Sequence, residues 1–119
     1  MRILIINILC CLAITTYGQT DCNKLQANFK SYNEAVSKIN STKFIFTESV
    51  NTSKSSWVRG ASYFSCDKVF GYFIIKTDKH NYIYKDLPIS VWNNFKNASS
   101  FGSFYDRNIK NRYQLYLTN

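Results

Sequence analysis

Three runs rich in β-branched and aromatic residues, at positions 57–64, 69–76 and 81–85, follow one another with only short links between them. The links, residues 65–68 and 77–80, are short and polar. Such connections join antiparallel neighbours, because a parallel crossover needs a dozen residues or more. The pattern predicts a small antiparallel sheet in the centre of a chain whose 119 residues suffice for one small domain.

An apolar stripe precedes these runs. Between residues 21 and 41 the large apolar side chains recur at the helical spacings of four, three, four and three, as Leu25, Phe29, Tyr32, Val36 and Ile39. We interpret this stripe as the core-facing side of a helix that Thr20 or Asp21 caps. Residues 42–50 are predicted to form a further strand, and residues 51–56 a polar loop.

The C-terminal part of the chain predicts two short helices. Pro88 suits the first turn of a helix, and an apolar face follows it, formed by Val91, Trp92 and Phe95. Ser99 and Ser100 interrupt that helix, and we expect Gly102 to take a positive φ and reverse the chain. The second helix is expected to hold Phe104, Tyr105 and Ile109, and a last strand to hold Tyr113, Leu115 and Leu117. The predicted fold class is α+β: a small antiparallel sheet with two short C-terminal helices and an extra N-terminal amphipathic helix.

The N-terminus has the layout of a secretory signal peptide. Arg2 precedes an apolar run over residues 3–14, and the small residues Thr16 and Gly18 follow it. The run is too short for a membrane span, which needs roughly 20 residues, although a retained anchor is the alternative. We expect residues 1–18 to be removed, leaving a secreted or periplasmic protein without a transmembrane span.

Cleavage would leave Cys22 and Cys66 as the only cysteines of the mature chain. In an oxidising compartment two cysteines can pair, and we expect this bridge, with two free thiols as the alternative. It would close a loop of roughly 45 residues and contribute about 3–4 kcal/mol by loop entropy. The whole chain has a formal net charge of +8, and the mature chain keeps most of it.

Residues suited to catalysis are sparse. The single histidine, His80, falls in a predicted turn, and the seven acidic residues are scattered. The sequence has no glycine-rich phosphate loop and no Gly-x-Ser-x-Gly motif. A nucleophilic role for Cys66 would need a positioned base, and two cysteines with one histidine cannot form a four-ligand zinc site. We therefore expect no enzyme activity, no metal site and no cofactor.

An ordered set of features from Ser55 onward resembles the KTSC domain, a module named for the C-terminus of some lysyl-tRNA synthetases and found also as a stand-alone bacterial protein. The matching features are Tyr82-Ile83-Tyr84, Leu87-Pro88, the helix with Val91, Trp92 and Phe95, the break at Ala98-Ser99-Ser100 with Gly102, the pair Phe104-Tyr105, and Ile109 and Tyr113. Where the family often has an aromatic residue followed by Asn, this chain has Tyr105-Asp106. With the features described above, the predicted domains are a signal peptide (1–18), an N-terminal helix with a linker or strand (19–54) and, by the resemblance, a KTSC-like domain (55–119).

The resemblance implies a fold more firmly than a function, and it makes RNA binding one expectation. Candidate binding residues are Tyr82, Tyr84, Lys96, Arg107, Lys110 and Arg112, because tyrosines on a strand can stack on bases and basic side chains can hold phosphates. The alternative is that both tyrosines belong to the core. Secretion favours a binding or interaction module for a protein or peptide, a glycan or another envelope component, with nucleic acid as the alternative partner.

Overall fold

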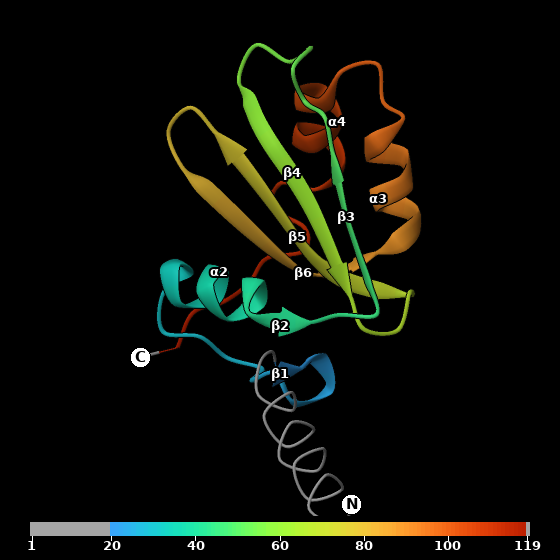
Figure 1. Cartoon of the computed structure of the whole chain (residues 1–119). Coiled ribbons are helices and arrows are strands. Elements are labelled where there is room, and N and C mark those ends of the chain that lie inside the picture. Colours follow the sequence, from blue (N-terminus) through green and yellow to red (C-terminus); the bar gives the residue numbers. More distant parts are fainter. Residues whose placement is uncertain (1–19, 119) are drawn as a thin grey trace, which may run out of the picture.

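The computed structural model describes residues 20–118, and its centre is a four-stranded antiparallel sheet (Figure 1). The strands lie in chain order: β3 (Phe46–Val50), β4 (Val58–Ser65), β5 (Phe70–Thr77) and β6 (Asn81–Pro88). Three α-helices join them: α2 (Tyr32–Asn40), α3 (Ile89–Lys96) and α4 (Phe101–Asn108). The predicted α+β class, the antiparallel sheet and the two C-terminal helices are confirmed.

Helices cover both faces of this sheet. On one face α3 and α4 pack a large aromatic cluster against Phe73, Ile75 and Tyr84. On the other face α2 packs a smaller cluster against Ile74 and Ile83. Side chains alternate between the faces of a strand, so the three consecutive buried residues of β5, Phe73 to Ile75, are explained by a cover on each side.

The predicted helix over residues 21–41 is wrong in its first half, because α2 begins only at Tyr32. The Ser31 hydroxyl accepts a hydrogen bond from the Glu34 N–H at 3.1 Å, and the Glu34 carboxylate accepts from the Lys30 N–H at 3.1 Å. This reciprocal cap is a strong helix start. Phe29, placed in the stripe by its spacing, is fully buried although it lies before the helix.

The segment ahead of α2 contains the predicted disulfide. A short strand, β1 (Thr20–Asp21), leads into a 3₁₀ turn, η1 (Cys22–Lys24). Asp21 caps this 3₁₀ turn and not the α-helix that was predicted to start there. Cys22 is bonded to Cys66 in the turn between β4 and β5, with the Cα atoms 5.8 Å apart. The bridge is thereby confirmed.

The predicted signal peptide, residues 1–18, lies outside the described residues. No helix in the described part of the chain is long and apolar enough to cross a membrane.

The strand predicted at residues 42–50 is divided into two. β2 (Thr42–Lys43) pairs in parallel with β1, and β3 begins after a gap of two residues. Phe44 packs on the α2 side against Phe64, with ring centroids 5.6 Å apart, whereas Phe46 packs on the opposite side against Tyr63 at 6.3 Å. One regular strand cannot send these side chains to opposite faces, since residues two apart share a face.

The break between α3 and α4 is confirmed, but the predicted role of Gly102 is wrong. Ser100 caps α4 by accepting from the Ser103 N–H at 3.2 Å, and Gly102 lies inside the helix without a positive φ. A Cβ at this position would lie 2.6 Å from the Trp57 ring. Glycine is therefore needed for close packing, and not for a reversal of the chain.

The predicted last strand is also wrong. The tail after α4 makes two isolated bridges, an antiparallel one between Tyr84 and Gln114 and a parallel one between Phe29 and Leu117. Leu115 is buried between them, in the α2-side cluster. The tail passes from the α4 side of the sheet to the α2 side across the edge of β6, so no continuous ladder forms.

Candidate functional site

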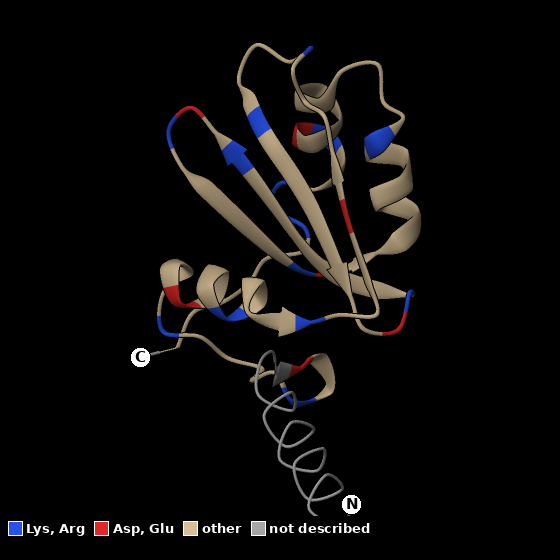
Figure 2. Ribbon diagram, viewed as in Figure 1, with Lys and Arg blue, Asp and Glu red and all other residues tan. Residues whose placement is uncertain are grey.

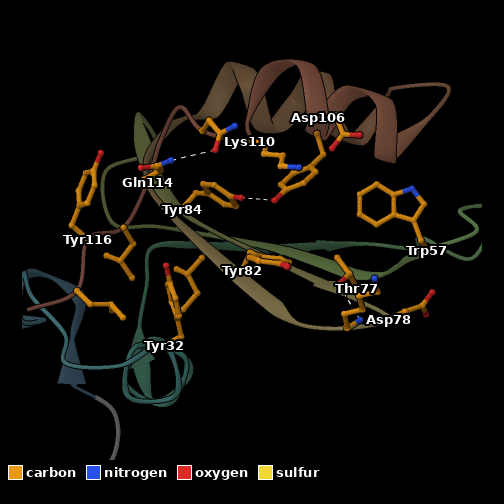
Figure 3. Close-up of a pocket in the computed structure, with 16 residues that line it drawn as sticks. Tyr32, Trp57, Thr77, Asp78, Tyr82, Tyr84, Asp106, Lys110, Gln114 and Tyr116 are labelled. Carbon is orange, nitrogen blue, oxygen red and sulfur yellow. Dashed lines mark hydrogen bonds between the residues drawn. The ribbon is translucent and has the colours of Figure 1, made fainter.

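A groove of about 800 Å³ lies beside β6, between α4 on one side and α2 and the C-terminal tail on the other (Figure 3). We call it the β6 groove. Its lining includes six aromatic side chains from five separate segments of the chain: Tyr32, Trp57, Tyr82, Tyr84, Tyr105 and Tyr116. A concave site with apolar and aromatic walls and a few polar groups is the usual form of a ligand-binding site.

Two of the residues that line the groove are buried tyrosines. Tyr84 on β6 and Tyr105 on α4 are 6% and 4% exposed, and their hydroxyls are hydrogen-bonded to each other (Figure 3). One hydroxyl donates to the other, so the pair retains one further O–H proton that can be donated to a ligand. Burial, followed by the hydrogen bond to Tyr105, raises the pKa of Tyr84 well above its ordinary value of 10. Burial likewise raises the pKa of Tyr105. The pair therefore remains protonated at neutral pH.

More exposed aromatic rings form the rim. Tyr32 at the start of α2 is 44% exposed, Tyr82 on β6 is 36% exposed and Tyr116 in the tail is 76% exposed. Trp57, just before β4, meets Tyr105 edge to face at 6.0 Å. Rings held at the border between protein and solvent offer apolar faces for stacking together with polar atoms that bind water or a ligand.

The charges at the rim are nearly balanced. Asp78 in the turn between β5 and β6 is paired with Arg59 at 2.7 Å. The other charged lining residues are Lys79, Asp106 and Lys110, and none of these three forms an ion pair within the described residues. Two free lysines against one free carboxylate leave the groove weakly positive.

The six candidate binding residues taken from the sequence are divided by the structure. Tyr82, Tyr84 and Lys110 line the groove. Arg107 on α4 and Arg112 in the turn after it are exposed and lie outside the lining. Figure 2 shows basic residues spread over several elements.

Lys96, the remaining candidate, lies at the end of α3 and has a partner. Its ammonium group donates to the Glu48 carboxylate at 2.5 Å, and the Trp92 indole N–H donates to the same oxygen at 2.7 Å. The hydrogen bond from Lys96, followed by that from Trp92, lowers the pKa of Glu48 below its ordinary value of 4.5. Lys96 thus links α3 to β3 and takes no part in the groove.

Sequence reasoning missed four of the six aromatic groove residues: Tyr105, which it placed only in the second helix, and Tyr32, Trp57 and Tyr116. The last three have the least in common. They are far apart in the chain, and only the packing of α2, the loop before β4 and the tail around β6 brings them together. The glycine at position 102 was the one available signal, because it permits Trp57 to approach α4. His80 lies beside Tyr82, with ring centroids 6.0 Å apart, and is not part of the lining.

One group of potential metal ligands occurs in the described part of the chain, formed by Asp21, Cys22 and Cys66. Both sulfur atoms are joined in the disulfide. A cysteine binds a metal as its thiolate, and neither sulfur atom is a thiolate here. This group therefore does not have the donors of a metal site.

Comparison with known proteins gives a family for one segment. No curated protein and no solved structure matches the chain significantly. The family model described as the KTSC domain matches residues 74–113, about a third of the chain. This segment runs from the middle of β5 to the turn after α4, so it includes the buried tyrosine pair but not Tyr32, Trp57 or Tyr116. Residues 74–113 thus match the KTSC domain family, and the resemblance seen in the sequence is confirmed over that segment.

Proposed function

We propose that the protein is a non-enzymatic binding module and that the β6 groove holds its ligand. The observation that supports this is the gathering of six aromatic side chains around one concave surface of about 800 Å³. Exposed apolar side chains that gather on one surface often mark a site of interaction with a partner. Here three rings on one rim are at least one third exposed, namely Tyr32, Tyr82 and Tyr116.

The chemistry of the lining favours binding over catalysis. General acid–base catalysis at neutral pH is best served by groups whose pKa lies near 7. The two groove residues with shifted pKa values, Tyr84 and Tyr105, are shifted upward from 10 and therefore away from neutrality. Asp78 is occupied by its ion pair with Arg59. The two tyrosine hydroxyls are suited to forming hydrogen bonds with a bound molecule.

We further propose that the protein works outside the cytoplasm, as a secreted or periplasmic protein. The Cys22–Cys66 disulfide supports this, because such bonds persist in oxidising compartments and are rare in the cytosol. The ligand would then be a component of that environment, such as a peptide or a glycan. Nucleic acid is a weaker candidate, since Lys96, Arg107 and Arg112 do not line the groove.

Tryptophan fluorescence offers a direct test. Trp57 lines the groove and is partly exposed, whereas Trp92 is fully buried in the core and gives a constant background. The protein would be titrated with chitohexaose, with an oligothymidylate and with a pool of random peptides. We expect a saturable change in fluorescence with one of these classes, and its loss in a Trp57→Phe variant. Binding of the oligothymidylate, with an affinity that falls steeply with added salt, would identify nucleic acid as the ligand.

A matched pair of variants assigns the site. Tyr116→Ala removes an exposed ring from the rim, and Phe70→Ala removes a ring that is 48% exposed and lies outside the lining. We expect the first change to weaken binding of the active probe and the second to leave it unaltered. Equal effects of the two changes, or no binding by any of the three probe classes, would contradict the proposal.

A further inference from the structure

The outer edge of β6 is open over its first half. The sheet ends at β6, whose neighbour on the inner side is β5. On the outer side, the described residues make a single bridge, between Tyr84 and Gln114, where the Lys85 N–H donates to the Tyr113 carbonyl at 2.8 Å. After Gln114 the tail leaves this edge, and its next bridge is with Phe29, on the α2 side. Residues 81 and 82 therefore have no strand on their outer side among the residues described, and at Ile83 only Leu115 of the departing tail lies alongside.

Two hydrogen bonds fix which backbone groups face outward. The Thr77 N–H donates to the His80 carbonyl at 2.9 Å, so the backbone groups of His80 point toward β5. Lys85 faces away from β5, as its bond to the tail shows. The direction of backbone groups alternates along an antiparallel strand, and both contacts therefore place the N–H groups of Asn81 and Ile83 on the outer side. No described backbone or side-chain group accepts a hydrogen bond from either of them across this edge.

This open edge runs along the base of the β6 groove. In Figure 3, β6 passes beneath α4 while Tyr32 rises from α2 on the opposite side. Ile83 itself lines the groove, and Tyr82 and Tyr84 point to the α4 side of it. A chain lying along the edge would meet backbone partners from β6 and aromatic rings on both sides. The free hydroxyl proton of the tyrosine pair adds a donor suited to a carbonyl oxygen.

We propose that the β6 groove binds an extended acidic peptide segment of another protein, which adds to the edge of β6 as a further strand. The inference rests on the proposed function and specifies its ligand. Strand addition to an open sheet edge is a general mode of peptide recognition, in which backbone hydrogen bonds supply affinity and side-chain pockets supply specificity. The tail already begins this ladder at Tyr84 and Gln114, and the added strand continues it where the tail turns away.

Charge specifies the peptide further. Lys79 and Lys110 border the groove without an ion-pair partner among the described residues, against one unpaired carboxylate, Asp106, because Asp78 is neutralised by Arg59. The whole chain carries a formal charge of +8. Complementary potential speeds association and selects partners. In a segment that alternates apolar residues with Asp or Glu, the apolar side chains can pack against the aromatic walls. The carboxylates can pair with the two free ammonium groups.

The test uses a 12-residue random peptide library displayed on phage, selected against the full chain with its disulfide intact. A peptide enriched in the selection is then synthesised and methylated at one backbone nitrogen at a time. We expect acidic residues to be enriched, and methylation at every second position to lower the affinity about tenfold, because it removes one ladder hydrogen bond. Methylation at the intervening positions should have little effect.

A matched pair of protein variants probes the same edge from the other side. Asn81→Pro removes the outward N–H at the first residue of an edge strand, where proline is tolerated, and Asn81→Ala keeps that N–H. The first change should weaken the peptide about tenfold and the second should not. Uniform tolerance of methylation, equal effects of the two substitutions, or selection of no peptide would overturn strand addition. Binding of chitohexaose or oligothymidylate at Trp57 in that event would leave the proposed binding function standing.

Discussion

The contact between Gly102 and Trp57 yields a prediction whose sign depends on the background. In Gly102→Ala the new Cβ would lie 2.6–2.7 Å from three atoms of the indole ring. Ordinary contacts of this kind need about 3.5–4 Å, so the ring must move by about 1 Å or the helix must shift. Overpacking of this kind costs about 1–3 kcal/mol. Alanine in a helix is favoured over glycine by about 0.5–1 kcal/mol, so a net loss of about 1–2 kcal/mol is expected.

Removing the ring should reverse that effect. In a Trp57→Ala background the three atoms nearest to the Cβ are removed, and Gly102→Ala should then stabilise the protein by up to about 1 kcal/mol through helix propensity. The four proteins of this double-mutant cycle would be compared by urea unfolding, with equal m-values as the check on two-state behaviour. If Gly102→Ala has the same sign in both backgrounds, close packing is not the reason for glycine at this position. The larger Gly102→Val change should cost more than Gly102→Ala in the parent chain.

Three further predictions concern the bridge, an ion pair and the buried hydroxyls. Reduction of the Cys22–Cys66 disulfide should lower the free energy of unfolding by about 4 kcal/mol by loop entropy, and identical urea midpoints with and without reductant would argue against this. The pKa of Glu48 is lowered on folding, so the ionised carboxylate stabilises the folded protein at pH values above its ordinary pKa of 4.5. This stabilisation is lost as the pH falls through the pKa of Glu48 in the folded protein. The stability gap between the parent and Glu48→Gln should therefore shrink in acid, and a gap independent of pH would refute this. Because the pKa of Tyr84 is raised, its stabilisation is complete below pH 10 and is lost as the pH rises above it. Tyr84→Phe should cost about 1–3 kcal/mol at neutral pH, since Tyr105 loses its partner; unchanged stability would show that the pair contributes nothing.

The sheet could be predicted from sequence because its determinants are local. The β-branched and aromatic residues of each run and the polar links of residues 65–68 and 77–80 specify strands, direction and order without reference to the rest of the chain. The disulfide was predictable from the count of cysteines. The start of α2 was missed because Phe29 continues the helical spacing while packing from a non-helical segment, where Ser31 and Glu34 fix the true start.

The groove was less predictable than the fold. Tyr82 and Tyr84 share one strand face, but α4 covers Tyr84 and leaves Tyr82 partly open, and this difference depends on where a helix some 20 residues later lies. Replacing a buried aromatic residue by alanine lowers the free energy of unfolding by about 3 kcal/mol or more. Tyr82→Ala should cost less than that, because Tyr82 is partly exposed. Tyr32, Trp57 and Tyr116 carry no common motif. Their convergence is a property of the tertiary structure alone.

The unequal layers of the sheet imply that the molecule opens in stages. The α2 layer rests on a small cluster that includes Phe29, Ile39 and Leu115, and the tail is held to it by the Thr118 N–H, which donates to the Phe29 carbonyl at 2.9 Å. The α3 and α4 layer rests on a cluster of larger aromatic residues. In native-state hydrogen exchange the amides of α2 should lose protection in a sub-global opening, while those of β5, enclosed on both faces, exchange only through global unfolding. Such an opening would carry Tyr32 and the tail away from β6 together and so dismantle one wall of the groove, with the Cys22–Cys66 bond keeping the released segment tethered.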